Sequence, residues 1–160
     1  MNVVQGDLIE MALQGHFDVI VQGCNCQCRM ARGIALTIRR VFPEAQMADS
    51  ATKPGDRAKL GTISTATVHR NGHAITIVNG YTQFHWAGAG VKADYDAIRL
   101  VMQTVRRQFS GLRIGYPKIG AGLAGGDWAT IRAIISEELA GEDHTYVEFE
   151  GGDPVPVEGT

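Results

Sequence analysis

The sequence predicts a single α/β domain, in which helices cover both faces of a mixed central sheet. Apolar segments typical of strands alternate with segments of helical periodicity, which favours parallel strands joined by helices. One pair of β-branched segments is instead joined by a hairpin signal, which adds an antiparallel strand. A chain of 160 residues with 44% hydrophobic content suits one domain with a full core. We expect this domain to span residues 1–150, and the Gly- and Pro-containing residues 151–160 to form a flexible C-terminal tail.

The first half of the chain is expected to open with a strand over residues 3–5 and a short helix over residues 8–13. Asp7 precedes this helix as a candidate N-cap, and Glu10 three residues later completes a capping box. The remaining elements of this half are a buried strand over residues 17–23, a helix over residues 34–41 that ends before Pro43, and short helix mixed with loop over residues 44–59.

The second half is expected to begin with the hairpin, whose strands span residues 62–69 and 74–78 around Asn71-Gly72. Residues 80–91 are predicted to form a loop that holds Tyr81, His85 and Trp86. The pattern then predicts a helix over residues 94–109, a strand over 112–116, a helix over 128–139 and a last strand over 146–149.

Composition and charge exclude several classes of protein. The net charge of −2 gives no general attraction to nucleic acid or to an anionic membrane. No apolar run approaches the roughly 20 residues that cross a bilayer, and the N-terminus lacks the pattern of a signal peptide. Nothing resembles a dedicated interface helix. We therefore expect a cytoplasmic protein without membrane contact. A monomer is the working expectation, although these observations leave the oligomeric state open.

The three cysteines, Cys24, Cys26 and Cys28, are crowded into one segment. Alternate residues of one strand cannot easily close a disulfide, so a secreted disulfide framework is not expected. Zinc needs about four ligands, and no second Cys/His cluster supplies the rest. We predict no metal site.

Two glycine-rich segments, residues 23–35 and 117–128, each lie between a strand pattern and a helix pattern. Glycine lets backbone N–H groups approach an anion, and the helix that follows points its positive end at the same place. Ligands of such sheets gather at the carboxyl ends of the strands, where both segments fall. Two such loops on neighbouring strands can hold both phosphates of a diphosphate, so the ligand is predicted to be nucleotide-like.

Gly6-Asp7-Leu8, Asn25 with Gly33-Ile34-Ala35, and Ile119-Gly120-Ala121-Gly122-Leu123 together resemble a macrodomain in order and separation. The resemblance covers nearly the whole chain up to about residue 150. Cys28-Arg29-Met30 leading into Gly33 resembles the branch that holds the terminal ADP-ribose protein glycohydrolase and the yeast-type ADP-ribose-1″-phosphate phosphatases. The family implies a three-layer α/β/α sandwich with an ADP-ribose pocket.

Carried over to this chain, the resemblance implies a role for each matching residue. Asp7 would accept a hydrogen bond from the adenine amino group, the Leu8 backbone would lie beside the ring, and Phe149 is a candidate stacking face. Asn25 would face the distal ribose, which Tyr81 and Gln83 would also line. Backbone groups would hold the diphosphate from two sides: Arg32, Gly33, Ile34 and Ala35 on one, and Ile119, Gly120, Ala121, Gly122 and Leu123 on the other.

The catalytic residues of the glycohydrolase are absent from the matching positions. Its lysine falls in the segment 79–83, which contains no lysine, and its aspartate falls on Ala124. A covalent lysine mechanism is therefore not predicted. Asp127 is the nearest replacement and a candidate general base: together with Asn25, it would orient a water at the distal ribose. Asp127 also directly precedes a helix pattern, and a role as N-cap alone is the favoured alternative. No metal or cofactor is required.

These observations predict a macrodomain that binds ADP-ribose and hydrolyses a derivative at the distal ribose, either a 1″-phosphate or an ADP-ribosyl adduct. The main alternative is a module that binds ADP-ribose without chemistry. A third hypothesis is a cysteine phosphatase, because the segment from Cys26 to Arg32 fits the C-x5-R loop that holds phosphate beside a thiolate. Under that hypothesis, the second glycine-rich loop has no role.

Overall fold

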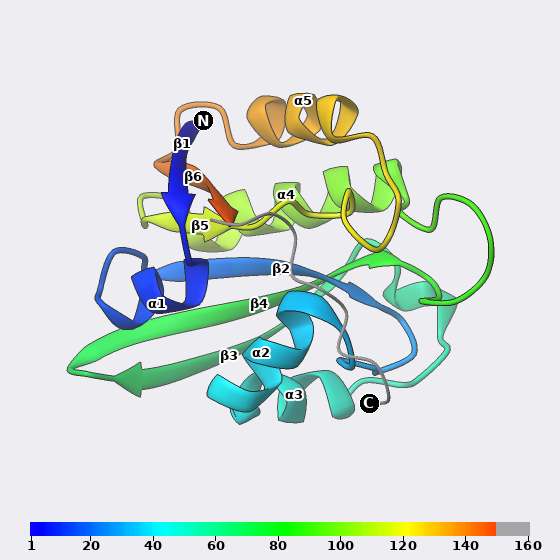
Figure 1. Ribbon diagram of the computed structural model, residues 1–160, viewed down its shortest axis with the longest axis horizontal. Coiled ribbons are helices and arrows are strands. Elements are labelled where there is room, and N and C mark those ends of the chain that lie inside the picture. The colour runs from blue at the N-terminus through cyan, green and yellow to red at the C-terminus, as the bar shows by residue number, and fades with distance from the viewer. Residues whose placement is uncertain (150–160) are drawn as a thin grey trace.

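A computed structural model describes residues 1–149 as one α/β domain with a six-stranded sheet (Figure 1). The strand order is β1-β6-β5-β2-β4-β3. All neighbouring strands are parallel except β3 and β4, so the sheet is mixed, as predicted. The predicted tail, residues 151–160, lies outside the described residues. The strands are β1 (Asn2–Gly6), β2 (Val19–Asn25), β3 (Ile63–Arg70), β4 (His73–Gln83), β5 (Ile114–Tyr116) and β6 (His144–Phe149).

Helices cover both faces of the sheet and complete the three layers (Figure 1). Successive side chains of β2 point to opposite faces of the sheet and so belong to two hydrophobic cores. Val19 and Val21 pack in the core under α4 and α5, whereas Ile20 packs in the core under α1, α2 and α3. A strand buried on both faces is the pattern that parallel sheets require. The helices are α1 (Leu8–Leu13), α2 (Gly33–Val41), α3 (Pro43–Ser50), α4 (Tyr95–Phe109) and α5 (Trp128–Glu138), with a short 3-10 helix η1 (Arg57–Lys59).

The local signals for helix starts and for the hairpin are confirmed. Asp7 caps α1 by accepting hydrogen bonds from the amides of Ile9 and Glu10. The hairpin turns at Asn71 and Gly72, which have φ of 52° and 77°, as a type I′ turn requires. Pro43, predicted to limit the preceding helix, also begins α3, where a residue without an N–H loses no helical hydrogen bond.

The predicted loop over residues 80–91 is wrong in its first part. β4 continues to Gln83, because this central strand pairs with β2 on one side and, as far as Gly80, with β3 on the other. Pairing on both sides overrides the weak strand propensity of Asn79 and Gly80. Tyr81 is consequently part of the sheet and fully buried. Within residues 1–149, no helix is long and apolar enough to cross a membrane.

Candidate active site

A cleft of about 1470 Å³ lies at the carboxyl ends of the parallel strands. Its walls come from the residues that end β1, β6, β5, β2 and β4, which is also their order across the sheet. The volume exceeds the roughly 300–1,000 Å³ of common small-molecule pockets. Most of the predicted ligand-binding residues line it: Asp7, Leu8, Asn25, Arg32, Gly33, Ile34, Ala35, Ile119, Gly120, Gly122, Leu123 and Phe149.

The N-terminus of α2 forms one wall in the middle of the cleft. Arg32 precedes the helix and gives it no side-chain cap. The amides of Gly33, Ile34 and Ala35 therefore find no acceptor within residues 1–149. Unpaired N–H groups at the positive end of a helix, next to an exposed arginine, form a site for an anion.

The second glycine-rich loop faces this helix from the end of β5. Hydrogen bonds from the Gly125 amide to the Gly122 carbonyl (3.1 Å) and from the Gly126 amide to the Gly120 carbonyl (2.7 Å) fold it into a tight turn. The amides of Gly122 and Leu123 are left without an acceptor among the described residues. A Cβ on Gly33 would lie 3.5 Å from the Leu123 side chain, so the two loops meet across the cleft.

Asp7 and Phe149 occupy one end of the cleft. Gly6, which precedes Asp7, pairs in register with Phe149 at the end of β6. One oxygen of the Asp7 carboxylate caps α1, and the other accepts no hydrogen bond from residues 1–149. The Phe149 ring is 44% exposed, so it is not a core residue. A free carboxylate oxygen beside an exposed ring suits a flat base with an exocyclic amine.

Asn25 lies at the opposite end, where its side chain shapes the adjoining turn. Its Oδ1 accepts hydrogen bonds from the amides of Gln27 (3.0 Å) and Arg29 (3.4 Å), and its Nδ2 donates to the Arg29 carbonyl (2.8 Å). The residue is buried but borders the cleft. Its main role in the free protein is to hold residues 25–29, and one N–H remains for a ligand.

The lining residues that the sequence analysis did not select include Arg29, Trp86 and Lys92. All three line the end of the cleft beyond β2 and β4, together with Gln83. The backbone amide of Lys92 donates to the carbonyl of Ala124 (2.8 Å), which fixes this lysine against the second glycine-rich loop. The signal in the sequence is the short run Ala87-Gly88-Ala89-Gly90 between an aromatic residue and a lysine.

Two predicted site residues, Tyr81 and Ala121, do not line the cleft. The Tyr81 hydroxyl lies 2.8 Å from Asp49 Oδ1, to which it donates, and 2.8 Å from Ser64 Oγ. Both residues are buried, and this burial raises the pKa of the Tyr81 phenol and of the Asp49 carboxyl. The prediction that Tyr81 faces the distal ribose is wrong, because the strand carries it into the core.

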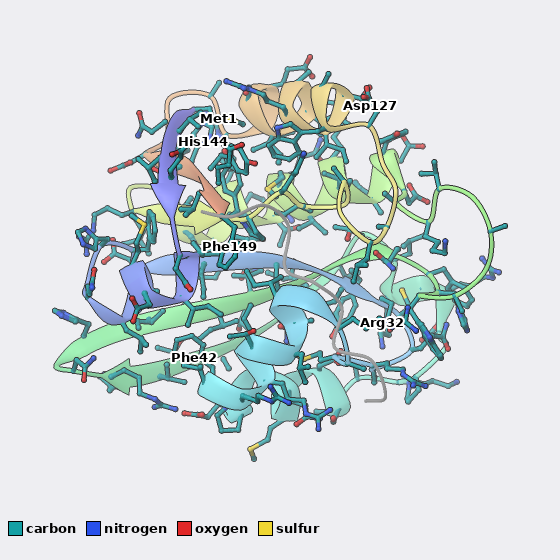
Figure 2. The ribbon with its side chains drawn as sticks, in the orientation of Figure 1. Met1, Arg32, Phe42, Asp127, His144 and Phe149 are labelled. Carbon is teal, nitrogen blue, oxygen red and sulfur yellow. The ribbon has the colours of Figure 1, made fainter. Side chains whose placement is uncertain are left out.

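Asp127 is also outside the cleft lining and caps α5. Its Oδ2 accepts hydrogen bonds from the Thr130 hydroxyl (2.6 Å) and the Thr130 amide (3.2 Å), which hold the pKa of the carboxyl below its usual range. Figure 2 shows Asp127 at the start of α5, well away from Arg32 and Phe149. The placement supports the cap and not the general base.

Replacing Asp127 with alanine is therefore expected to lower the melting temperature by a few degrees without changing ligand affinity or turnover. Asp127→Ser is the matched control, because serine restores the cap without a carboxylate. Thermal unfolding and activity of the two variants, measured side by side, check the assignment. A loss of turnover in both, with normal folding, would return Asp127 to the chemistry.

The cysteine-phosphatase hypothesis does not fit the structure. Cys26, the nucleophile of that hypothesis, is completely buried, and burial raises the pKa of its thiol. A buried, protonated thiol cannot attack a phosphate ester. Within residues 1–149, no group of three or more His, Cys, Asp or Glu side chains is arranged to hold a metal ion.

Comparisons with known proteins agree with this geometry. No family model matches the sequence. The chain is 29% identical over 155 residues to an uncharacterized 17.5 kDa protein of Enterobacteria phage T4, covering 94% of this chain and 97% of that protein. It is 30% identical over 129 residues to the DNA ADP-ribosyl glycohydrolase of Mycobacterium tuberculosis, covering 79% of this chain and 35% of the relative. This chain thus spans about a third of the mycobacterial protein.

Solved structures share the fold over nearly the whole chain. The macrodomain of Mycobacterium tuberculosis DarG superposes with a TM-score of 0.67 at 22% identity, covering 96% of this chain and 98% of that one. A Trypanosoma brucei macrodomain in complex with ADP-ribose superposes with a TM-score of 0.60 at 16% identity, covering 92% and 63%. The fold of this chain is that of the macrodomains.

Proposed function

We propose that the chain binds ADP-ribose in the cleft and hydrolyses the bond between the distal ribose and an acceptor group. One observation carries the proposal: two sets of unpaired backbone amides, at Gly33–Ala35 and Gly122–Leu123, face each other across the middle of the cleft. Their positions on facing walls of the cleft suit the two phosphates of a diphosphate.

The order of strand ends sets the direction of the ligand. Adenine lies at the β1/β6 end, where Asp7 accepts from its amino group and Phe149 stacks on the ring. The diphosphate lies between the second glycine-rich loop and α2. The distal ribose then reaches the β2/β4 end, beside Asn25, Gln83 and Lys92. A reversed ligand would place a phosphate against the Asp7 carboxylate.

The chemistry at the distal ribose rests on charge placement. Among the described residues that line the cleft, the carboxylates are Asp7 and Glu148, both at the adenine end. Cleavage of a glycosidic bond builds positive charge on the ribose and negative charge on the departing group. The diphosphate held by the loops would face the first charge. The Lys92 ammonium, which donates to the Gly90 carbonyl (2.9 Å) and belongs to a residue that lines the cleft, would place positive charge near the second while water attacks the ribose carbon.

The acceptor is proposed to be a nucleic-acid base. The mycobacterial relatives carry the name DNA ADP-ribosyl glycohydrolase. They match this chain over 79% of its length. The alternative is a binding module without chemistry. One observation favours it: among the described residues that line the cleft, no carboxylate lies at the Lys92 end to activate a water.

The experiment is isothermal calorimetry with ADP-ribose and AMP, followed by an assay for ADP-ribose release from an ADP-ribosylated single-stranded oligonucleotide. Wild type is expected to bind ADP-ribose more tightly than AMP by about tenfold or more, because AMP lacks the second phosphate and the distal ribose. It is expected to release ADP-ribose. Binding without release would make the chain a binding module, and no binding would overturn the proposal.

Asp7→Ser sharpens this experiment. Serine keeps the N-cap of α1 but is too short to meet the adenine amino group. We expect weaker ADP-ribose binding by about tenfold, with an unchanged melting temperature, because one hydrogen bond to a charged acceptor is lost. Equal affinity of the variant and the wild type would place adenine elsewhere.

A further inference from the structure

The exposed side chain of Arg29 has no polar partner within the described residues. Its backbone is held by Asn25, but its guanidinium donates no hydrogen bond and makes no ion pair within residues 1–149. The guanidinium instead lies 4.6 Å from the centre of the Trp86 ring. Five unused donors on a side chain that borders the cleft indicate a contact with a ligand.

Trp86 is itself held in a stack. Its ring centre is 4.1 Å from that of His85, with 18° between the planes. The backbone on either side is fixed, because the Gln83 side chain donates to the His85 carbonyl (3.1 Å) and the Ala87 amide donates to His85 Nδ1 (3.0 Å). A planar cation supported by a fixed aromatic pair offers a flat, preformed surface.

This surface belongs to the distal end of the cleft, where the acceptor would leave. Arg29 and Trp86 line that end with Gln83 and Lys92. A phosphate or a carboxylate acceptor needs charge there but no flat surface. An unpaired nucleobase needs both, because bases stack on guanidinium planes and on aromatic side chains.

We propose that Arg29, supported by Trp86, forms a stacking subsite for a base of a single-stranded nucleic acid that carries the ADP-ribosyl group. The subsite rests on the proposed function and adds to it a residue that selects a nucleic-acid acceptor over a peptide. A duplex base is stacked within its own helix, so the subsite accepts single strands.

Arg29→Lys tests the subsite because it keeps the positive charge and removes the plane. We measure kcat/KM for release of ADP-ribose from an ADP-ribosylated single-stranded oligonucleotide and the affinity for free ADP-ribose. The expected result is a fall of about tenfold in kcat/KM with ADP-ribose affinity within about twofold of wild type, since stacking of one base is lost. Trp86→Ala is expected to match this loss, and Trp86→Phe to retain most of the activity.

Two results would overturn the subsite. The first is unchanged kcat/KM on the oligonucleotide in Arg29→Lys, which would reduce the role of Arg29 to charge. The second is an equal loss of affinity for free ADP-ribose, which would place Arg29 inside the ADP-ribose pocket. Wild-type binding of ADP-ribose in the same titrations separates failure of the subsite from failure of the proposed function.

Discussion

Replacing Gly122 with valine is expected to abolish tight binding of ADP-ribose while leaving the fold intact. A Cβ at Gly122 would meet no atom within 4 Å, so the free protein has room for it. The proposed diphosphate would occupy this space and accept from the unpaired amides of Gly122 and Leu123, so a valine side chain would block both contacts. Loss of two hydrogen bonds to an anion, each worth about 1.5–3 kcal/mol, weakens binding by about a hundredfold or more. Calorimetry measures the loss of ADP-ribose affinity, and thermal unfolding of the same sample checks that the fold is intact.

Gly126→Ala is the contrasting control. A Cβ there would lie 2.6 Å from the Gly120 carbonyl oxygen and 2.8 Å from Ile131, so the loop has to shift. We expect Gly126→Ala to lower the melting temperature, whereas Gly122→Val does not. Wild-type affinity in a folded Gly122→Val variant would remove the second glycine-rich loop from the binding site.

Asn25→Ala is expected to lower both the stability of the protein and its rate of ADP-ribose release. The side chain makes three hydrogen bonds to the backbone of Gln27 and Arg29, and it is only 8% exposed. Truncation leaves these groups unpaired, for a loss of about 1–3 kcal/mol in the free energy of unfolding. The released turn also carries Arg29, so ADP-ribose release falls with it. Urea unfolding and the release assay measure the two effects.

Asn25→Asp separates the two roles of this residue. The aspartate still accepts from the amides of Gln27 and Arg29 but cannot donate to the Arg29 carbonyl. We expect a smaller loss of stability than in Asn25→Ala. Unchanged stability in Asn25→Ala would mean that the turn holds itself and that Asn25 acts on the ligand alone.

Local signals in the sequence predicted the frame of the site well. Asp7 caps α1 and Asn71-Gly72 turns the hairpin because a cap and a turn depend on residues a few positions apart. The glycine-rich segments 23–35 and 117–128 fall at strand ends because alternating strands and helices fix where the loops emerge.

Placements that depend on contacts distant in the sequence were wrong or missed. The sequence predicted Tyr81 in a loop, but the pairing of β4 with β2 extends the strand through this residue and buries it in the core. Asp127 follows the glycine loop in the chain, yet the turn closed by the Gly126 amide directs it toward α5. The contact between Arg29 and Trp86 joins segments on two different strand ends. No local pattern encodes that contact.

The most direct test of the account is an NMR titration of the 15N-labelled protein with ADP-ribose. The account predicts that the largest shifts occur at the amides of Gly33, Ile34, Ala35, Gly122 and Leu123, which have no acceptor within residues 1–149 of the free protein. If both phosphates bind as proposed, the signals of the two sets of amides would shift together over the same range of ligand concentration. Tight binding with shifts confined to other amides would contradict the account, because the two loops would then not hold the diphosphate.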